Sequence, residues 1–242
     1  MSSTLKEKGN LIISGSGSAT GGEYDQVKIS GSGRISGDIE CEKFLCNGSS
    51  KVEGDIEGVQ ITINGSTKVG GDVRSKETLK VNGSTVIEGS VLYKEFKISG
   101  SSRILGDTSG EHLILRGSVK IEGDCEAEYA EFNGSFKIEG LLNADKVEIE
   151  LNGRSYVKEI GGEIISVTRT KSNLLDRLFK PLAKELTAEV IEGDKVEIEY
   201  TQADVVRGNH IKIGPGCKVD LVEYKGELDI HDNASVKEIK KV

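Results

Sequence analysis

The segments VKISGSGRISGDIE at 27–40 and FLCNGSSKVEGDIE at 44–57 align without a gap, and six further copies of this phrase adjoin them. The eight copies begin at residues 11, 27, 44, 61, 79, 96, 113 and 130, so the spacing is 16 to 18 residues throughout. Self-similarity at a short fixed period is typical of solenoid proteins, in which each repeat forms one turn of a stack. The sequence therefore predicts eight consecutive coils of about seventeen residues.

The positions within each copy alternate in polarity. The first, third and ninth positions are almost all apolar, the fifth and eleventh are always Gly, and the sixth is always Ser. Period-two alternation predicts half-buried strands, and seventeen residues have room for three short strands but not for two helices. Gly at a corner permits a positive φ or a close backbone approach, and Ser can bond the turn backbone. We therefore expect a parallel β-helix whose first eight coils form a rod roughly 35–40 Å long.

The pattern loosens after the eighth copy. DKVEIE at 145–150 recurs at 194–199, and short alternating runs follow it. We interpret 1–10 as a flexible tail, 11–168 as regular β-helix, 169–187 as a helical insertion and 188–242 as less regular coils. Those last coils either resume the same axis or form a second short stack.

The segment SNLLDRLFKPLAKEL at 172–186 interrupts the repeat. Its apolar residues have helical spacing, Ser172 is suited to the N-cap, and Pro181 should kink the helix. Such a helix would either pack on the solenoid or present a basic amphipathic patch to a membrane surface or an acidic partner. The residues predicted for that contact are Leu174, Leu175, Leu178, Phe179, Leu182, Leu186, Arg177, Lys180 and Lys184.

Composition and charge exclude several classes of function. The net charge of −8 argues against a nucleic-acid partner, because phosphate binding needs an excess of Lys and Arg. Neither a signal peptide nor an apolar run long enough to span a bilayer is present, which predicts a cytoplasmic protein that reaches the inner face of the membrane through 172–186. The four Cys residues match no zinc pattern, and Cys41, Cys46 and Cys125 fall on apolar columns.

The outward columns carry rows of charge. A basic row that includes Arg34, Lys51 and Lys68 runs between rows of Glu and Asp, so we expect a mutually paired, solvated surface. The Asp row could hold calcium or serve acid–base hydrolysis, but Asx turns after the corner Gly explain it. His112, His210 and His231 form no catalytic motif. We therefore predict a protein that is not an enzyme and that uses no metal or cofactor.

The repeated phrase, as in KISGSGRISGDIE and LCNGSSKVEGDIE, resembles the bactofilins, which are bacterial polymer-forming cytoskeletal proteins. The resemblance covers residues 11 to about 143 well and the remainder loosely. It implies a right-handed parallel β-helix that assembles end to end without nucleotide. It also implies a scaffold that localises client proteins in cell shape, envelope or motility structures. The helical interruption and the extra C-terminal stretch depart from the family pattern.

Every solenoid has two ends, and its terminal coils expose unpaired backbone groups that favour stacking. The apolar columns reach the N-terminal end at Leu11 and Ile13, which are our candidates for end-to-end assembly of a homopolymer. Two other functions stay open on the sequence alone. One is a hexapeptide acyltransferase, since Gly31 and Gly37 recur six residues apart, and the other is a ligand-binding solenoid that presents its Ser or charge rows.

Overall fold

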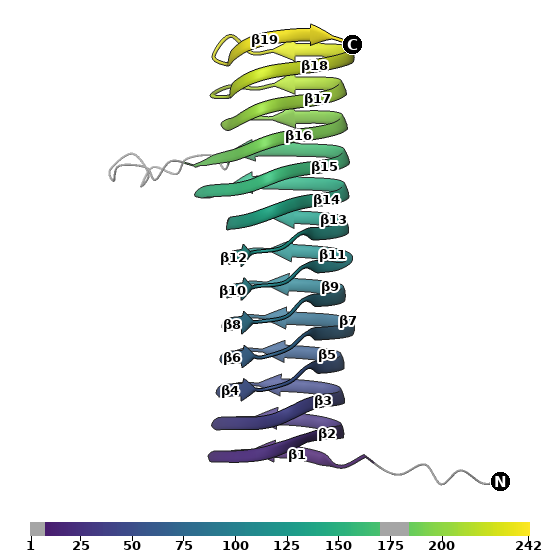
Figure 1. Cartoon of the computed structure of the whole chain (residues 1–242). Coiled ribbons are helices and arrows are strands. Elements are labelled where there is room, and N and C mark those ends of the chain that lie inside the picture. Colours follow the sequence, from purple (N-terminus) through teal and green to yellow (C-terminus); the bar gives the residue numbers. More distant parts are fainter. Residues whose placement is uncertain (1–7, 170–183) are drawn as a thin grey trace, which may run out of the picture.

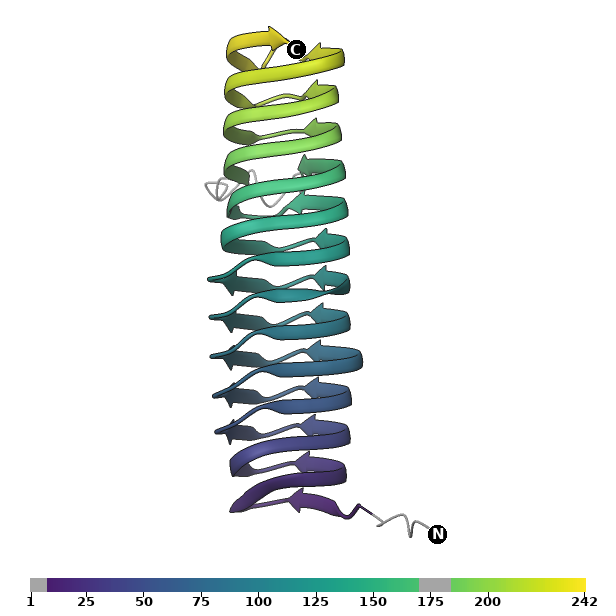
Figure 2. The ribbon, with the colours of Figure 1, turned by 45° about the vertical axis from the view of Figure 1, so that its right-hand side comes forward.

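The computed structural model describes residues 8–169 and 184–242, which form one column of stacked coils (Figure 1). The column has about 13 turns, and every strand pairing within it is parallel. The prediction of an all-β parallel β-helix with coils of about seventeen residues is confirmed. Figure 2 shows the same column from another side, with the N-terminal coil at one end and the C-terminal coil at the other.

The described residues form nineteen strands, which follow one another up the column. Those of the first half are β1 (Asn10–Ile13), β2 (Ser16–Ile29), β3 (Ser32–Cys46), β4 (Ser49–Val52), β5 (Ile56–Ile63), β6 (Ser66–Val69), β7 (Val73–Val81), β8 (Ser84–Ile87), β9 (Val91–Ile98) and β10 (Ser101–Ile104). Those of the second half are β11 (Thr108–Leu115), β12 (Ser118–Ile121), β13 (Cys125–Phe132), β14 (Ser135–Leu151), β15 (Arg154–Arg169), β16 (Glu185–Ile198), β17 (Thr201–Ile213), β18 (Lys218–Ile230) and β19 (Ser235–Lys241).

Each coil has three faces separated by corners. The first face precedes the Gly-Ser corner, the second face follows it, and the third face follows the second Gly. In the coil that begins at residue 44, Phe44 of β3, Val52 of β4 and Ile56 of β5 point inward from the three faces and are at most 1% exposed. Because every coil repeats this alternation in register, the core is a continuous stack of Val, Ile, Leu and Phe side chains.

The column continues across the interruption in the repeat. β15 pairs in parallel with β16 from Arg154↔Glu185 to Val167↔Ile198, and β17, β18 and β19 extend the same stack. Residues 184–242 therefore resume the axis rather than form a second stack. The predicted helix at 172–186 lies mostly outside the described residues. Its last part is wrong, since Glu185 and Leu186 belong to β16 and Leu186 is fully buried in the core.

The corner glycines of the fifth column are required by close stacking and not by a positive φ. From Gly31 to Gly134, an added Cβ would lie between 1.8 and 2.2 Å from the carbonyl oxygen of the column glycine one coil earlier. None of these glycines has a positive φ, whereas Gly37, at the other corner, has a φ of 90°. The backbone thus passes too close to its neighbour for any side chain, which explains the absence of exceptions from Gly31 to Gly134.

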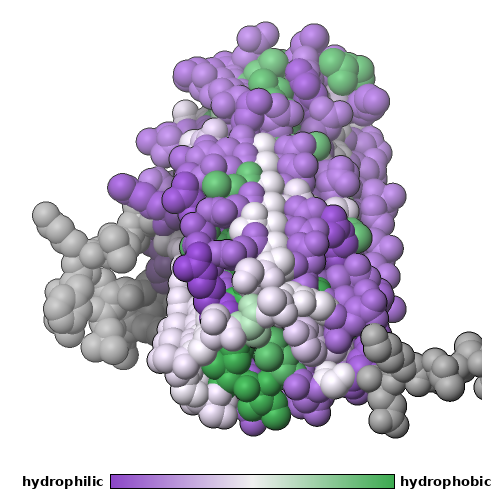
Figure 3. Space-filling view, turned by 60° about the horizontal axis from the view of Figure 1, so that its bottom comes forward, coloured by the Kyte–Doolittle hydropathy of each residue, from purple (hydrophilic) through white to green (hydrophobic). Residues whose placement is uncertain are grey.

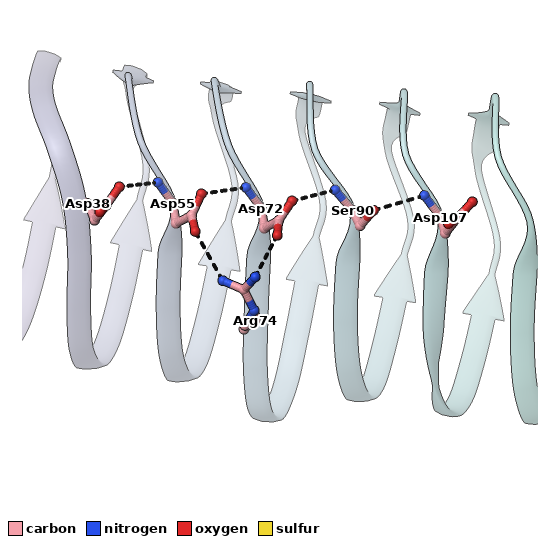
Figure 4. A network of polar contacts seen from close by, with 6 residues as sticks. All are labelled: Asp38, Asp55, Asp72, Arg74, Ser90 and Asp107. Carbon is pink, nitrogen blue, oxygen red and sulfur yellow. Dashed lines mark hydrogen bonds and ion pairs between the residues drawn. The ribbon is translucent and has the colours of Figure 1, made fainter.

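The Asp row forms a ladder between coils (Figure 4). Oδ1 of Asp38 accepts a hydrogen bond from the backbone N–H of Asp55 at 2.9 Å, and Asp55 accepts in the same way from Asp72 at 2.8 Å. Ser90 occupies one rung, and its hydroxyl accepts from the N–H of Asp107 at 3.1 Å. Our expectation that local Asx turns explain this row is wrong, because each bond spans a full coil.

Asp72→Ala tests the contribution of one rung. Oδ1 of Asp72 accepts from the N–H of Ser90 at 2.9 Å, and its loss leaves that donor unsatisfied. We expect the free energy of unfolding to fall by about 1–3 kcal/mol in thermal or urea unfolding. Asp72→Asn is the matched control, since it keeps an acceptor oxygen and removes the charge. Equal losses in both variants would mean that the ion pairs with Arg74, and not the ladder, stabilise this corner.

Candidate assembly surfaces at the two ends

The N-terminal end exposes the start of the core columns. Leu11 and Ala19 are only partly buried, although Val27 and Ile35, the next residues of their columns, are fully buried. Ile13 is 8% exposed. Figure 3 shows an apolar patch at this end, surrounded by polar and neutral residues. We call Leu11, Ile13 and Ala19 the N-terminal end surface.

The C-terminal end exposes the same columns at their other limit. Ile239 is 51% exposed, whereas Val222, its partner one coil earlier, is 0% exposed. Leu228 and Val236 are partly buried for the same reason. We call Leu228, Val236 and Ile239 the C-terminal end surface. Our sequence analysis missed it, because Val236 and Ile239 lie three residues apart and simple alternation does not put them on one side of a strand. Their pairing with Val219 and Val222 is what places both in core columns.

Backbone edges accompany the apolar surfaces. β1 pairs only with β2, and β19 pairs only with β18, so each terminal strand has one hydrogen-bonded neighbour. Within 8–169 and 184–242, no segment lies across either end of the column (Figure 1). Uncovered strand edges present rows of donors and acceptors that can pair with a further strand. Both ends therefore combine an open core with an open edge.

Ion pairs lie beside each end. Near the N-terminal end, the pKa of Lys8 is raised above its ordinary value because Lys8 bonds Glu40 and Glu23, each at 3.2 Å. Near the C-terminal end, Arg207 and Lys240 lower the pKa of Glu223, which accepts from them at 2.6 and 3.1 Å. Each group is thus held in its charged form close to an apolar surface, as in the polar rim of a protein interface.

The helix residues predicted to contact a partner or a membrane cannot be placed at either end. Leu174, Leu175, Leu178, Phe179, Leu182, Arg177 and Lys180 all lie outside the described residues. Lys184 is half-buried and directly precedes β16, and Leu186 is in the core. No helix in the described ranges is long and apolar enough to cross a membrane.

The charge rows pair with one another along the second face. Lys68 contacts Glu88 at 2.8 Å, Arg103 contacts Glu122 at 2.6 Å and Lys137 contacts Glu139 at 2.7 Å. The predicted mutual pairing of this surface is therefore observed. Exposed ion pairs of this kind contribute little to stability individually, about 0–1 kcal/mol each. Because these charges are paired, the second face has little net positive charge with which to attract a polyanion.

The residues with catalytic or metal-binding chemistry are dispersed. Within the described part of the chain, no group of three His, Cys, Asp or Glu side chains is arranged to hold a metal ion. Cys41, Cys46, Cys125 and Cys217 are buried and unpaired as thiols. Burial raises the pKa of the Cys41 and Cys125 thiols to about 12. These cysteines thus serve as small core residues rather than as nucleophiles.

The fold and its surfaces define a class of protein: a long β-solenoid with polar sides and with apolar ends that residues 8–169 and 184–242 leave uncovered. Comparison with known proteins assigns the family. The model of the bactofilins, described as polymer-forming cytoskeletal proteins, matches residues 1–91, 26–109 and 61–158. This chain belongs to the bactofilin family.

Two relatives come from Bacillus subtilis. The chain is 48% identical to the uncharacterized protein YhbE over 229 residues, which are 93% of this chain and 95% of YhbE. It is 38% identical to the uncharacterized protein YhbF over 102 residues, which are 42% of this chain and 41% of YhbF. No solved structure matches the chain.

Proposed function

We propose that this bactofilin is a non-enzymatic cytoskeletal scaffold that assembles end to end, without nucleotide, into a homopolymer. The observation that carries the proposal is that the core columns and the backbone edges reach both ends uncovered within the described residues. Stacking a second copy would bury Leu11 and Ala19 at one end or Val236 and Ile239 at the other. It would also provide partners for the strand edges, which a single copy leaves open to water.

The sides of the column suit a scaffold. The second face is covered by paired charges, and client proteins can bind there without competing with the ends. We propose that the polymer localises such clients in processes of cell shape, envelope growth or motility. It would act in the cytoplasm, at the inner face of the membrane, with contact through the part of 172–186 that precedes β16.

Electron microscopy tests the proposal directly. Purified protein, without nucleotide or metal, is examined in negative stain over a range of protein and salt concentrations. We expect filaments whose length increases with protein concentration and whose formation is unaffected by added nucleotide. Discrete rods of one molecular length under every condition would contradict end-to-end assembly. The binding of candidate ligands to single rods would then be the function to examine.

A further inference from the structure

Asn-Gly dipeptides recur at the corner between the first and second faces. An Asn side chain that precedes Gly is prone to lose its amide spontaneously, because Gly has no Cβ to shield its backbone nitrogen from that side chain. The pairs are chemically alike, so a difference in their reactivity within the folded protein must come from the structure around each corner. The five pairs are Asn47-Gly48, Asn64-Gly65, Asn82-Gly83, Asn133-Gly134 and Asn152-Gly153.

The first three pairs are held by the coil that precedes each of them. The backbone N–H groups of Gly48, Gly65 and Gly83 donate to carbonyl oxygens one coil earlier, at 3.2 to 3.3 Å. A Cβ added at these glycines would lie 1.8 to 2.0 Å from a backbone oxygen of that coil. The side chains are held as well, since Asn64 donates to Asn47 at 2.8 Å. Neither the peptide nor the amide can therefore turn toward the other without displacing a neighbour.

The corner at Asn152 and Gly153 lacks this clamp. It connects β14 to β15 and lies 19 residues after Asn133, two more than the usual coil of seventeen. Among the described residues, the nearest atom to a Cβ added at Gly153 is the Cβ of Ser135, at 3.7 Å. The same measure at Gly134 gives 2.2 Å to a carbonyl oxygen, so that corner is still clamped. Asn152 is also exposed, which gives water access to its side chain.

We propose that Asn152 is a site of spontaneous deamidation in the folded protein, and that stacking protects the other four corner asparagines. The backbone nitrogen of Gly153 attacks Cγ of Asn152, and the proton of that nitrogen passes to a base in the solvent. The Cγ–Nδ2 bond breaks and ammonia leaves, which closes a succinimide ring. Water then adds to one of the two imide carbonyls and opens the ring to aspartate or isoaspartate. The step is independent of end-to-end assembly.

Deamidation would change the contacts between this corner and the coil below it. Nδ2 of Asn152 donates to Oδ1 of Asn133 at 2.6 Å, and Nδ2 of Asn133 donates to Glu150 at 2.8 Å. An ionised carboxylate has no proton to donate, so it would face the carbonyl oxygen of Asn133 without a hydrogen bond. It would also place a second negative charge near Glu150. The modification therefore weakens the stack in the coil directly before the interruption.

Peptide mapping by mass spectrometry tests the site in the unmodified protein. The folded protein is incubated at mildly alkaline pH in water enriched in oxygen-18, which labels only residues that convert during the incubation. We expect Asn152 to convert about tenfold faster or more than the other four, a ratio that corresponds to about 1.4 kcal/mol of local protection. In urea the five pairs should convert at similar rates, because the stack is absent. Equal rates in the folded protein, or an Asn152 as slow as Asn64, would overturn the proposal.

Three variants separate the chemistry from the fold. Gly153→Ala shields the backbone nitrogen, and the open space at this corner lets the column fold as before. We expect conversion of Asn152 to slow by about tenfold, with thermal unfolding within about 0.5 kcal/mol of the unmodified protein. An unchanged rate would contradict the succinimide step. Asn152→Asp, which is the product, should melt at a lower temperature than Asn152→Ser, which resembles the natural Ser30-Gly31 corner. Equal melting temperatures would contradict the weakening of the stack.

Discussion

Gly65→Ala is expected to lower the free energy of unfolding by about 3 kcal/mol, near the upper limit for overpacking by a single methyl group. The added Cβ would lie 1.8 Å from the carbonyl oxygen of Gly48, and both atoms belong to backbone that is fixed by the coil stack. The clash cannot be relieved by a side-chain rotation, so the two coils must separate locally and weaken their hydrogen bonds. For a chain of this size, the melting temperature should fall by about 6–12 °C.

Gly15→Ala is the matched control for this substitution. Gly15 occupies the same column in the first coil, and an added Cβ there has no atom within 4 Å. We expect its thermal unfolding to coincide with that of the unmodified protein to within about 0.5 kcal/mol. If both variants lose stability equally, the intrinsic conformational preference of Gly, and not the close approach of coils, explains the column.

Leu11→Lys is expected to raise the critical concentration for polymer formation by about 100-fold or more, while the circular dichroism of the rod stays unchanged. The substitution places an ammonium group on the apolar N-terminal end surface, where stacking would bury it without a partner, at a cost of several kcal/mol. Each 1.4 kcal/mol lost from the contact weakens association tenfold. Sedimentation of polymers over a protein concentration series measures the change.

Two further variants make this result specific. Ile12→Lys adds the same charge on the same strand, but Ile12 points off the axis from the first face and is 58% exposed, so end-to-end polymers should persist. Ile239→Lys changes the C-terminal end surface and should reduce polymer formation if that end also takes part. Polymers that survive the combined Leu11→Lys and Ile239→Lys substitutions would exclude end stacking as the mechanism.

The sequence predicted most of the fold because the repeat contains the information for each coil. Alternation in a segment such as FLCNGSSKVEGDIE decides which side chains face inward, and Phe44, Cys46 and Val52 are all fully buried as that pattern predicts. It also made Leu11 and Ile13 candidates for an end surface. The corresponding C-terminal residues were harder to find, because the period there shortens, with Ile198 pairing to Ile213.

The wrong expectations concern contacts that a single repeat does not contain. The Asp side chains were expected to bond their own turns, but Asp38 and Asp55 bond a backbone one coil away. Leu186 was expected to end a helix because it continues a four-residue leucine spacing. Its place in the core follows instead from Ser155 and Thr201, its strand partners on either side.

What the sequence alone determined is therefore the coil: its length, its inward columns and its invariant glycines. These features follow from period-two alternation and from repetition, both of which are local along the chain. Only the tertiary structure decided that the stack resumes its axis after the interruption, and that Ile239 is exposed where Val222 is buried. Burial depends on which coils lie above and below a residue, and that arrangement exists only in the assembled column.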